Sequence, residues 1–349
     1  MMARRARSAL AVSALAVSAL VLSALAVPGC DGRGARANPP APTQPATPAA
    51  TASARPVKPG LSAAASASAA GPSGPIIAAS ELTWVYDQTG VGPMQVVVRL
   101  PPRRAGQRFP VLIAMHGRGE AHKGPAHGAR GWVDDYGLVT ALERLHAPPL
   151  TAKDLENLAA PERLTRMNAA LAERAFGDMV VVCPYTPDIL AGDRPFSAAL
   201  PLARFLVDEL LPRVHRETPA LGTAESTGID GVSLGGRASV LVGLDRAEAF
   251  GAVAGLQAAF DSADAPELAR RAKRAREKNP KLAIRLLTSE GDFFLRATKS
   301  ISRALDEAGL SHELRIIPGP HDYVFNRGPG VYEMLVFHDR VLRGRAPVP

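Results

Sequence analysis

The feature of this chain that most constrains its fold is a regular alternation of apolar, strand-like runs with helix-like segments after Pro75. Runs that are apolar throughout, rather than at every second residue, are typical of a parallel sheet covered on both faces. Helices between such runs provide the crossover connections that parallel pairing requires. We predict eight strands, at residues 82–87, 94–100, 109–115, 179–183, 227–232, 250–256, 282–288 and 312–317.

The first two predicted strands are separated only by the turn at 90–93, which contains two glycines and a proline and favours an antiparallel pair. The later strands alternate with predicted helices at 198–216, 234–247, 265–278, 295–309 and 331–342. The expected fold class is therefore α/β, with a mostly parallel eight-stranded sheet and helices on both faces. In open sheets of this kind, the chemistry lies beyond the carboxyl ends of the strands.

The main irregularity is the long connection at 118–177, which follows the third predicted strand and contains predicted helices near 152–158 and 161–174. Connections of this length usually carry a lid or a wall of the substrate site, so we predict a lid-like insertion here. Trp132 and Tyr136 lie in it and are candidates to line an acyl or aromatic pocket, with packing in the core as the equal alternative.

The N-terminus has the composition of an export signal. Three arginines precede an almost uninterrupted apolar run at 8–27, which ends at Pro28-Gly29-Cys30. The arrangement resembles a bacterial lipoprotein signal, in which lipid is attached to a cysteine such as Cys30. We predict that residues 1–30 export the protein and that Cys30 anchors it as a periplasmic or cell-surface lipoprotein. An uncleaved membrane anchor and simple secretion are the alternatives.

Residues 31–75 consist mainly of Ala, Pro, Ser, Thr and Gly, a composition that buries too little apolar surface to fold. They are predicted to be a disordered tether, which leaves 76–349 as the folded domain. The net charge of +8 arises partly from arginines in the first 75 residues. A basic run at 270–276 has no interleaved aromatic residues, so it favours a solvated helix face over nucleic-acid binding.

The sequence GVSLGG at 231–236 follows a predicted strand and begins a predicted helix. A serine hydroxyl is a weak nucleophile, and hydrolases expose it on a sharp turn between a strand and a helix. Gly231 and Gly235 flank Ser233 at the positions where a Cβ atom would crowd such a turn. We predict that Ser233 is a nucleophile. A glycine-rich helix start with a capping serine is the alternative interpretation.

A serine nucleophile on this fold requires an acid after a later strand and a histidine after the last one. Asp292 follows the predicted strand 282–288, and His321 follows the strand 312–317. His321 is predicted to take the serine proton and return it to the leaving group, while Asp292 fixes the histidine tautomer. Other candidates for the acid are Glu290, Asp261 and Asp264.

An acyl-transfer site also needs backbone amides that face the developing oxyanion. We predict these donors to be the amide of Leu234, directly after the nucleophile, and the amide of Arg118, after the His116-Gly117 pair. No metal is expected, because the nearby acidic and histidine residues include neither a ligand pair at helical spacing nor a cysteine. The residues considered for a metal were His122, His127, Asp134 and Asp135.

These motifs resemble those of the α/β-hydrolase superfamily and, within it, of the esterase group that includes esterase D and the feruloyl and acetyl-xylan esterases. The resemblance spans residues 82–342. The matching segments are His116-Gly117, GVSLGG at 231–236, Phe250-Gly251-Ala252-Val253, Gly291-Asp292 and Pro320-His321-Asp322.

The resemblance implies serine-dependent hydrolysis of a carboxylic ester through an acyl-enzyme, with no metal or organic cofactor. The expected substrate is a small-molecule or polysaccharide-linked ester. The export signal argues against the cytosolic S-formylglutathione activity found in part of this group. The alternatives are a peptidase or acyltransferase with the same three residues, and a non-catalytic surface-binding lipoprotein.

Overall fold

The computed structural model describes residues 74–193 and 195–349. The predicted export signal, including Cys30, and nearly all of the predicted tether lie outside the described residues. None of the helices in the described part of the chain has the length and apolar character that a membrane crossing requires.

A single eight-stranded sheet organises the described residues, in the strand order β1-β2-β4-β3-β5-β6-β7-β8. β1 pairs antiparallel with β2, and β2 with β4, whereas the other neighbours pair in parallel. This confirms the predicted α/β class. The strands are β1 (Ser80–Tyr86), β2 (Met94–Leu100), β3 (Val111–Met115), β4 (Val180–Pro184), β5 (Thr227–Gly231), β6 (Ala252–Leu256), β7 (Ala283–Gly291) and β8 (Glu313–Pro320).

β7 and β8 both run beyond their predicted carboxyl ends. Their parallel pairing continues past Thr288 to join Ser289 with Ile317 and, after an irregularity, Gly291 with Pro320. The loops that carry Asp292 and His321 therefore start side by side at one edge of the sheet.

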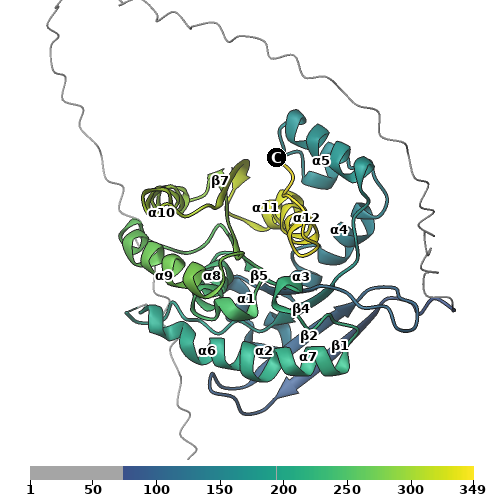
Figure 1. Cartoon of the computed structure of the whole chain (residues 1–349), viewed down its shortest axis with the longest axis horizontal. Helices are drawn as coiled ribbons and strands as arrows, with labels where there is room; N and C mark the ends of the chain where they lie inside the picture. Colours follow the sequence, from purple (N-terminus) through teal and green to yellow (C-terminus); the bar gives the residue numbers. More distant parts are fainter. Residues whose placement is uncertain (1–73, 194) are drawn as a thin grey trace, which may run out of the picture. The chain divides into compact units, whose positions relative to one another are not determined.

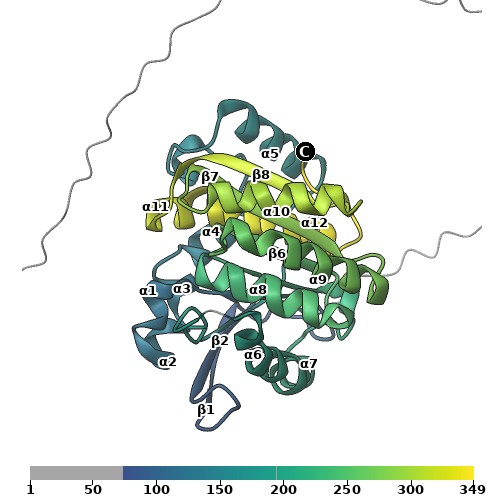
Figure 2. The same cartoon turned by 90° about the vertical axis from the view of Figure 1, so that its left-hand side faces the viewer.

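Helices cover both faces of the sheet, as predicted. On β3, Val111, Ile113 and Met115 belong to one apolar core, whereas Leu112 and Ala114 belong to the other. The first core is covered by α8 (Leu234–Asp245), α9 (Ala265–Lys278) and α10 (Leu295–Glu307), which lie side by side in Figure 2. A continuous helical stretch also packs there, formed by α6 (Leu200–Arg204), a π-helical segment (Phe205–Leu210) and α7 (Leu211–Glu217).

The second core is covered by α12 (Val331–Val341), α4 (Leu138–Leu145) and α5 (Pro161–Glu173), which Figure 1 places close together. α4 and α5 come from the connection at 118–177. Because β3 and β4 are parallel neighbours, the connection has to return along one face of the sheet. Its later part, with α4 and α5, packs into the second core as it does so. Its earlier part forms the short helices α1 (Arg118–Ala121), α2 (Gly124–Gly128) and α3 (Gly131–Asp134).

Candidate active site

Ser233 lies at the turn between β5 and α8 with φ 57° and ψ −113°. A positive φ is uncommon for a residue other than glycine and persists only where neighbouring contacts enforce it. Two such contacts come from the last residue of β6 and from the turn that follows it. The Ser233 amide donates to the Leu256 carbonyl at 2.9 Å, and the Ser233 carbonyl accepts from the Ala259 amide at 3.0 Å.

The two glycines that flank Ser233 are required by close backbone packing. A Cβ atom on Gly231 would lie 2.6 Å from the carbonyl carbon and oxygen of Gly235. A Cβ atom on Gly235 would lie 2.5 Å from the His116 carbonyl oxygen. The turn is therefore as tight as the sequence motif predicts.

Asp292 and His321 are hydrogen-bonded to each other, with 2.8 Å between Asp292 Oδ1 and His321 Nδ1. The carboxylate also accepts from the Thr288 hydroxyl at 2.5 Å and from the Phe294 amide at 2.9 Å. The side chain of Asp292 is fully buried, whereas that of His321 is 12% exposed. This arrangement orients the imidazole through Nδ1 and leaves Nε2 for another partner.

Ser233 and His321 line a common cavity of about 180 Å³. Arg118 and Tyr136, two further residues predicted for the site, line it as well. A larger cavity of about 270 Å³ lies elsewhere, between β2, α4 and Met179, and contains none of the predicted site residues. The remaining residues that line the cavity beside Ser233 are Gly117, Gly119, Glu120, Val232, Asp322, Tyr323 and Asn326.

The other candidates for the acid have different surroundings. Asp264 forms an ion pair with Arg237 at 2.9 Å and a reciprocal capping interaction with Asp261. Glu290 is exposed at the end of β7. Of these acids, Asp292 is the one that contacts His321.

Leu234 and Arg118, the predicted oxyanion donors, are the first residues of α8 and α1. Amides in the first turn of a helix have no acceptor within that helix, so they are available to a ligand. The guanidinium of Arg118 is engaged elsewhere, because Nε donates to Asp188 at 2.9 Å. Any contribution of Arg118 to an oxyanion site would therefore come from its backbone.

Glu120 is the centre of a polar network beside the cavity that the sequence did not reveal. This carboxylate is only 1% exposed and accepts a hydrogen bond from the Tyr323 hydroxyl at 2.6 Å and another from the Tyr136 hydroxyl. The Tyr136 oxygen in turn accepts from the Gly117 amide at 3.2 Å. The network thus joins the segment before Arg118 to the segment after His321.

Both tyrosines in this network remain protonated donors. Burial, followed by the neighbouring Glu120 charge, raises the pKa of Tyr136 well above its ordinary value. For Tyr323 the hydrogen bond to Glu120 is the largest cause of a raised pKa, followed by burial. Phenol groups of this kind donate hydrogen bonds at every physiological pH.

His116 supports the loop that precedes Arg118. Its Nε2 accepts from the Thr186 amide at 2.8 Å, and its Nδ1 lies 2.9 Å from the Gly117 carbonyl. Burial lowers the pKa of His116 to about 4, so the ring is neutral at pH 7. An imidazole with both nitrogens engaged by backbone groups has a structural role here.

Trp132 and Tyr136, the predicted pocket residues, are placed differently. Tyr136 lines the cavity, whereas Trp132 is 0% exposed and packs edge to face against Tyr136 at 5.0 Å.

In the described part of the chain, no group of three or more His, Cys, Asp or Glu side chains could hold a metal ion. Asp134 and Asp135, considered for a metal from the sequence, pair with Arg130 and Lys123.

No protein-family model and no curated protein matches this sequence. Solved structures do match, among them a ferulic acid esterase with TM-score 0.57 and 16% identity, over 76% of this chain and 100% of that one. The S-formylglutathione hydrolase FrmB of Staphylococcus aureus matches with TM-score 0.53 and 12% identity, over 75% of this chain and 99% of that one.

An S-formylglutathione hydrolase from Agrobacterium tumefaciens matches with TM-score 0.52 and 16% identity, over 76% of this chain and 99% of that one. The chain has the α/β-hydrolase fold. Its structural neighbours are esterases of that fold, but identities this low establish the architecture alone.

Proposed function

We propose that this protein is a serine hydrolase that cleaves a carboxylic ester through Ser233, His321 and Asp292. The observation that carries the proposal is the 2.8 Å hydrogen bond between Asp292 and His321, next to a cavity that His321 shares with Ser233. The chain order serine, acid, histidine and the strained turn at Ser233 support it. The esterase fold of the structural neighbours agrees with it.

In the proposed first step, His321 takes the proton of the Ser233 hydroxyl while the Ser233 oxygen attacks the ester carbonyl carbon. The amides of Leu234 and Arg118 stabilise the resulting oxyanion. When the tetrahedral intermediate collapses, the bond to the alcohol oxygen breaks and His321 protonates that oxygen. The product of this step is an acyl group on Ser233.

In the second step, water enters and His321 takes one of its protons as the water oxygen attacks the acyl-enzyme carbonyl. Collapse releases the carboxylic acid and returns the proton to Ser233. Asp292 holds the Nδ1 proton of His321 throughout and stabilises the imidazolium that forms in each step.

For the substrate, we propose a small-molecule or polysaccharide-linked ester whose acyl group contacts Tyr136 in the cavity. One structural neighbour, a feruloyl esterase module from Clostridium thermocellum, was solved with sinapinate, at TM-score 0.51 and 14% identity. Peptidase and acyltransferase activities use the same chemistry with a different leaving group or acceptor. Product analysis with matched ester, amide and acceptor substrates separates the three.

A fluorophosphonate probe tests the proposal directly, because it reacts only with an activated serine. We expect it to label Ser233 in the folded protein, and labelling to be lost in Ser233→Ala and strongly slowed in His321→Ala. Thermal melting of both variants checks that they are folded. Absence of labelling, or labelling independent of His321, contradicts the proposal and favours a non-catalytic binding protein.

We also propose that the protein is exported and anchored to a membrane through lipid on Cys30, as the sequence of residues 1–30 suggests. Metabolic labelling of cells with a tagged fatty acid should mark the full-length chain but not Cys30→Ala. Equal labelling of both forms, or of neither, contradicts lipidation at this cysteine.

A further inference from the structure

Gln257, which directly follows β6, has an unusual backbone conformation. Its φ is 46°, and its side chain is completely buried. Glycine adopts a positive φ far more readily than an unbranched residue such as glutamine. A buried glutamine at this position therefore points to a requirement for its side chain.

The side-chain amide of Gln257 joins the two loops that carry Asp292 and His321. Its Nε2 donates to the Ser289 hydroxyl oxygen at 2.7 Å and to the Pro320 carbonyl oxygen at 2.9 Å. The Ser289 hydroxyl donates to the same Pro320 carbonyl at 3.1 Å. That carbonyl belongs to the peptide bond preceding His321.

Only the donor end of this amide is used. Among the described residues, Gln257 Oε1 is buried and has no hydrogen-bond partner. The opposite amide orientation would place Oε1 against the Pro320 carbonyl oxygen, where two acceptors repel each other. The site thus requires an N–H donor that reaches two oxygens.

The turn at 256–259, which contains Gln257, also fixes the backbone of Ser233. As described above, the Leu256 carbonyl and the Ala259 amide hold the two sides of Ser233. The backbone amide of Gln257 donates to the Leu287 carbonyl on β7 at 2.6 Å. The turn at 256–259 therefore contacts the segments that carry Ser233, Asp292 and His321.

We propose that Gln257 is a positioning residue for the catalysis proposed above, and the inference rests on that proposed function. By holding the Pro320 carbonyl, Gln257 fixes the start of the His321 loop, so that the imidazole stays hydrogen-bonded to Asp292 and directed into the cavity. Misplacement of a catalytic group by about 1 Å can slow a reaction about 100-fold.

The first test is Gln257→Met, which keeps the length of the side chain but removes both N–H donors. We expect kcat for an ester to fall about 10-fold to 100-fold with little change in KM, because Gln257 does not line the cavity. Gln257→Leu, which also lacks an N–H donor in its side chain, should act in the same direction. The matched control is Gln95→Met, the same substitution at a glutamine whose Nε2 donates to the Ala126 carbonyl and which does not line the cavity. It should stay within a few-fold of the original protein.

Hydrogen exchange of the amides at 319–323 gives a readout that does not depend on activity. We expect faster exchange there in Gln257→Met than in the control Gln95→Met, with similar melting temperatures. An unchanged kcat, an effect confined to KM, or unchanged exchange in both Gln257 variants overturns the inference while leaving the proposed function intact. If Ser233→Ala hydrolyses esters as well as the original protein, the proposed function fails, and the exchange data still decide whether Gln257 holds this loop.

Discussion

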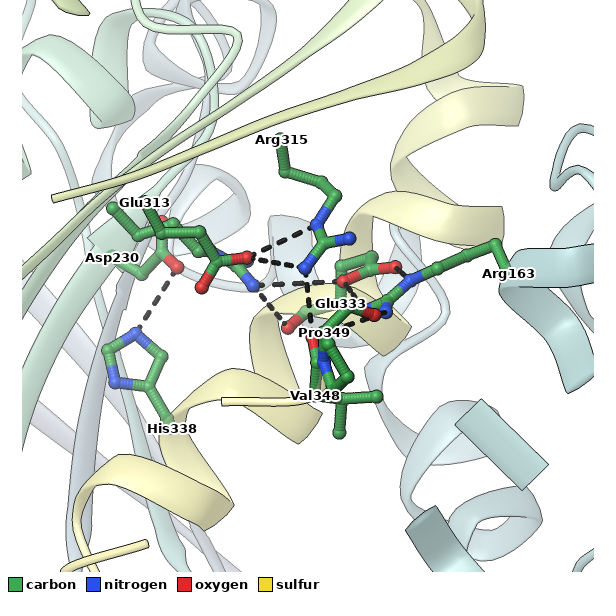
Figure 3. A network of polar contacts seen from close by, with 9 residues as sticks. Arg163, Asp230, Glu313, Arg315, Glu333, His338, Val348 and Pro349 are labelled. Carbon is green, nitrogen blue, oxygen red and sulfur yellow. Dashed lines mark hydrogen bonds and ion pairs between the residues drawn. The ribbon is translucent and has the colours of Figure 1, made fainter. Parts of the chain in front are cut away.

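Two of the aspartate–histidine pairs in the described part of the molecule differ in their surroundings. Asp292 and His321 are 2.8 Å apart, and His321 lines the cavity that contains Ser233. Asp230 and His338 are 3.2 Å apart, and both are almost completely buried between β5 and α12 (Figure 3). We propose that the same two residue types serve catalysis in the first pair and the fold in the second, because only the first pair shares a cavity with Ser233.

The buried pair contacts the turn that carries Ser233. Burial lowers the pKa of His338, although the hydrogen bond with Asp230 opposes this shift. A neutral His338 donates from Nε2 to Asp230 Oδ2, while Asp230 Oδ1 accepts from the Gly231 amide at 2.8 Å. Asp230 therefore joins α12 to the first glycine of the turn that carries Ser233.

Around the buried pair lies a cluster of charged residues that ties distant segments together. Figure 3 shows the guanidinium of Arg163 from α5 facing the carboxylate of Glu333 from α12, with two hydrogen bonds of 2.6 and 2.7 Å. Arg285 of β7 donates to the Glu333 carbonyl at 3.0 Å. These contacts hold α12 to α5 and to β7.

We expect the largest effect when the histidine beside the cavity is removed. His321→Ala should lower kcat for an ester by about 10⁴-fold to 10⁶-fold, because no other group takes the serine proton. Stability should change little, since His321 is at the cavity. Initial rates with a p-nitrophenyl ester and thermal melts measure both quantities, and a loss of less than 10-fold would show that His321 is not the base.

Asp292→Asn comes next. The amide keeps the size of the side chain but favours the wrong histidine tautomer, so kcat should fall by about 10⁴-fold. The control is Asp264→Asn, which alters a carboxylate that pairs with Arg237 and should leave kcat within a few-fold. Equal losses in the two variants would contradict the assignment of Asp292.

Glu333→Gln should affect the fold instead of the chemistry. It leaves the buried Arg163 guanidinium without its anionic partner, which typically costs about 3–5 kcal/mol. Urea unfolding measures the loss, and kcat per folded molecule should be close to that of the original protein. A normal stability combined with a strongly reduced kcat would contradict a purely structural role for the Glu333 cluster.

The smallest effect concerns pH. Burial lowers the pKa of His116 to about 4, so the folded protein protonates this ring at a lower pH than the unfolded chain does. Stability from this group is complete above pH 6.5 and is lost as pH falls toward 4, by about 3 kcal/mol in total. His338 acts in the same direction.

His116→Gln removes this titration, and Gln can still accept from the Thr186 amide. Urea unfolding from pH 8 to pH 5 should show a shallower loss of stability in the variant than in the original protein. Parallel pH profiles for the two proteins would contradict the neutral state assigned to the buried ring.

Most of the sheet was predictable because each strand is a separate apolar run. The helix at 265–278 was predicted with its observed limits, since its buried alanines and leucine alternate with charged residues at helical spacing. α4 was missed, although Leu138, Ala141 and Leu145 are spaced as one buried helix face. That stretch was interpreted as part of a lid-like insertion, which hid its role as a core layer.

The candidate site was predictable where a local motif marks it. Ser233, Asp292 and His321 each follow a strand, and their loops contain glycine or proline. Gln257 and Glu120 carry no such signal, because their roles arise from contacts with residues far away in the sequence. Asp230 and His338 equally look like any polar residues in a strand and a helix until the fold brings them together.

The proposed mechanism requires that Ser233 carries the acyl group during turnover. Mass spectrometry tests this requirement, on protein quenched during the initial rapid release of p-nitrophenol from p-nitrophenyl acetate. We expect an acetyl group on the peptide that contains Ser233, absent in Ser233→Ala and much slower to form in His321→Ala. Hydrolysis without acylation of Ser233, or acylation of another residue that persists in Ser233→Ala, would contradict it.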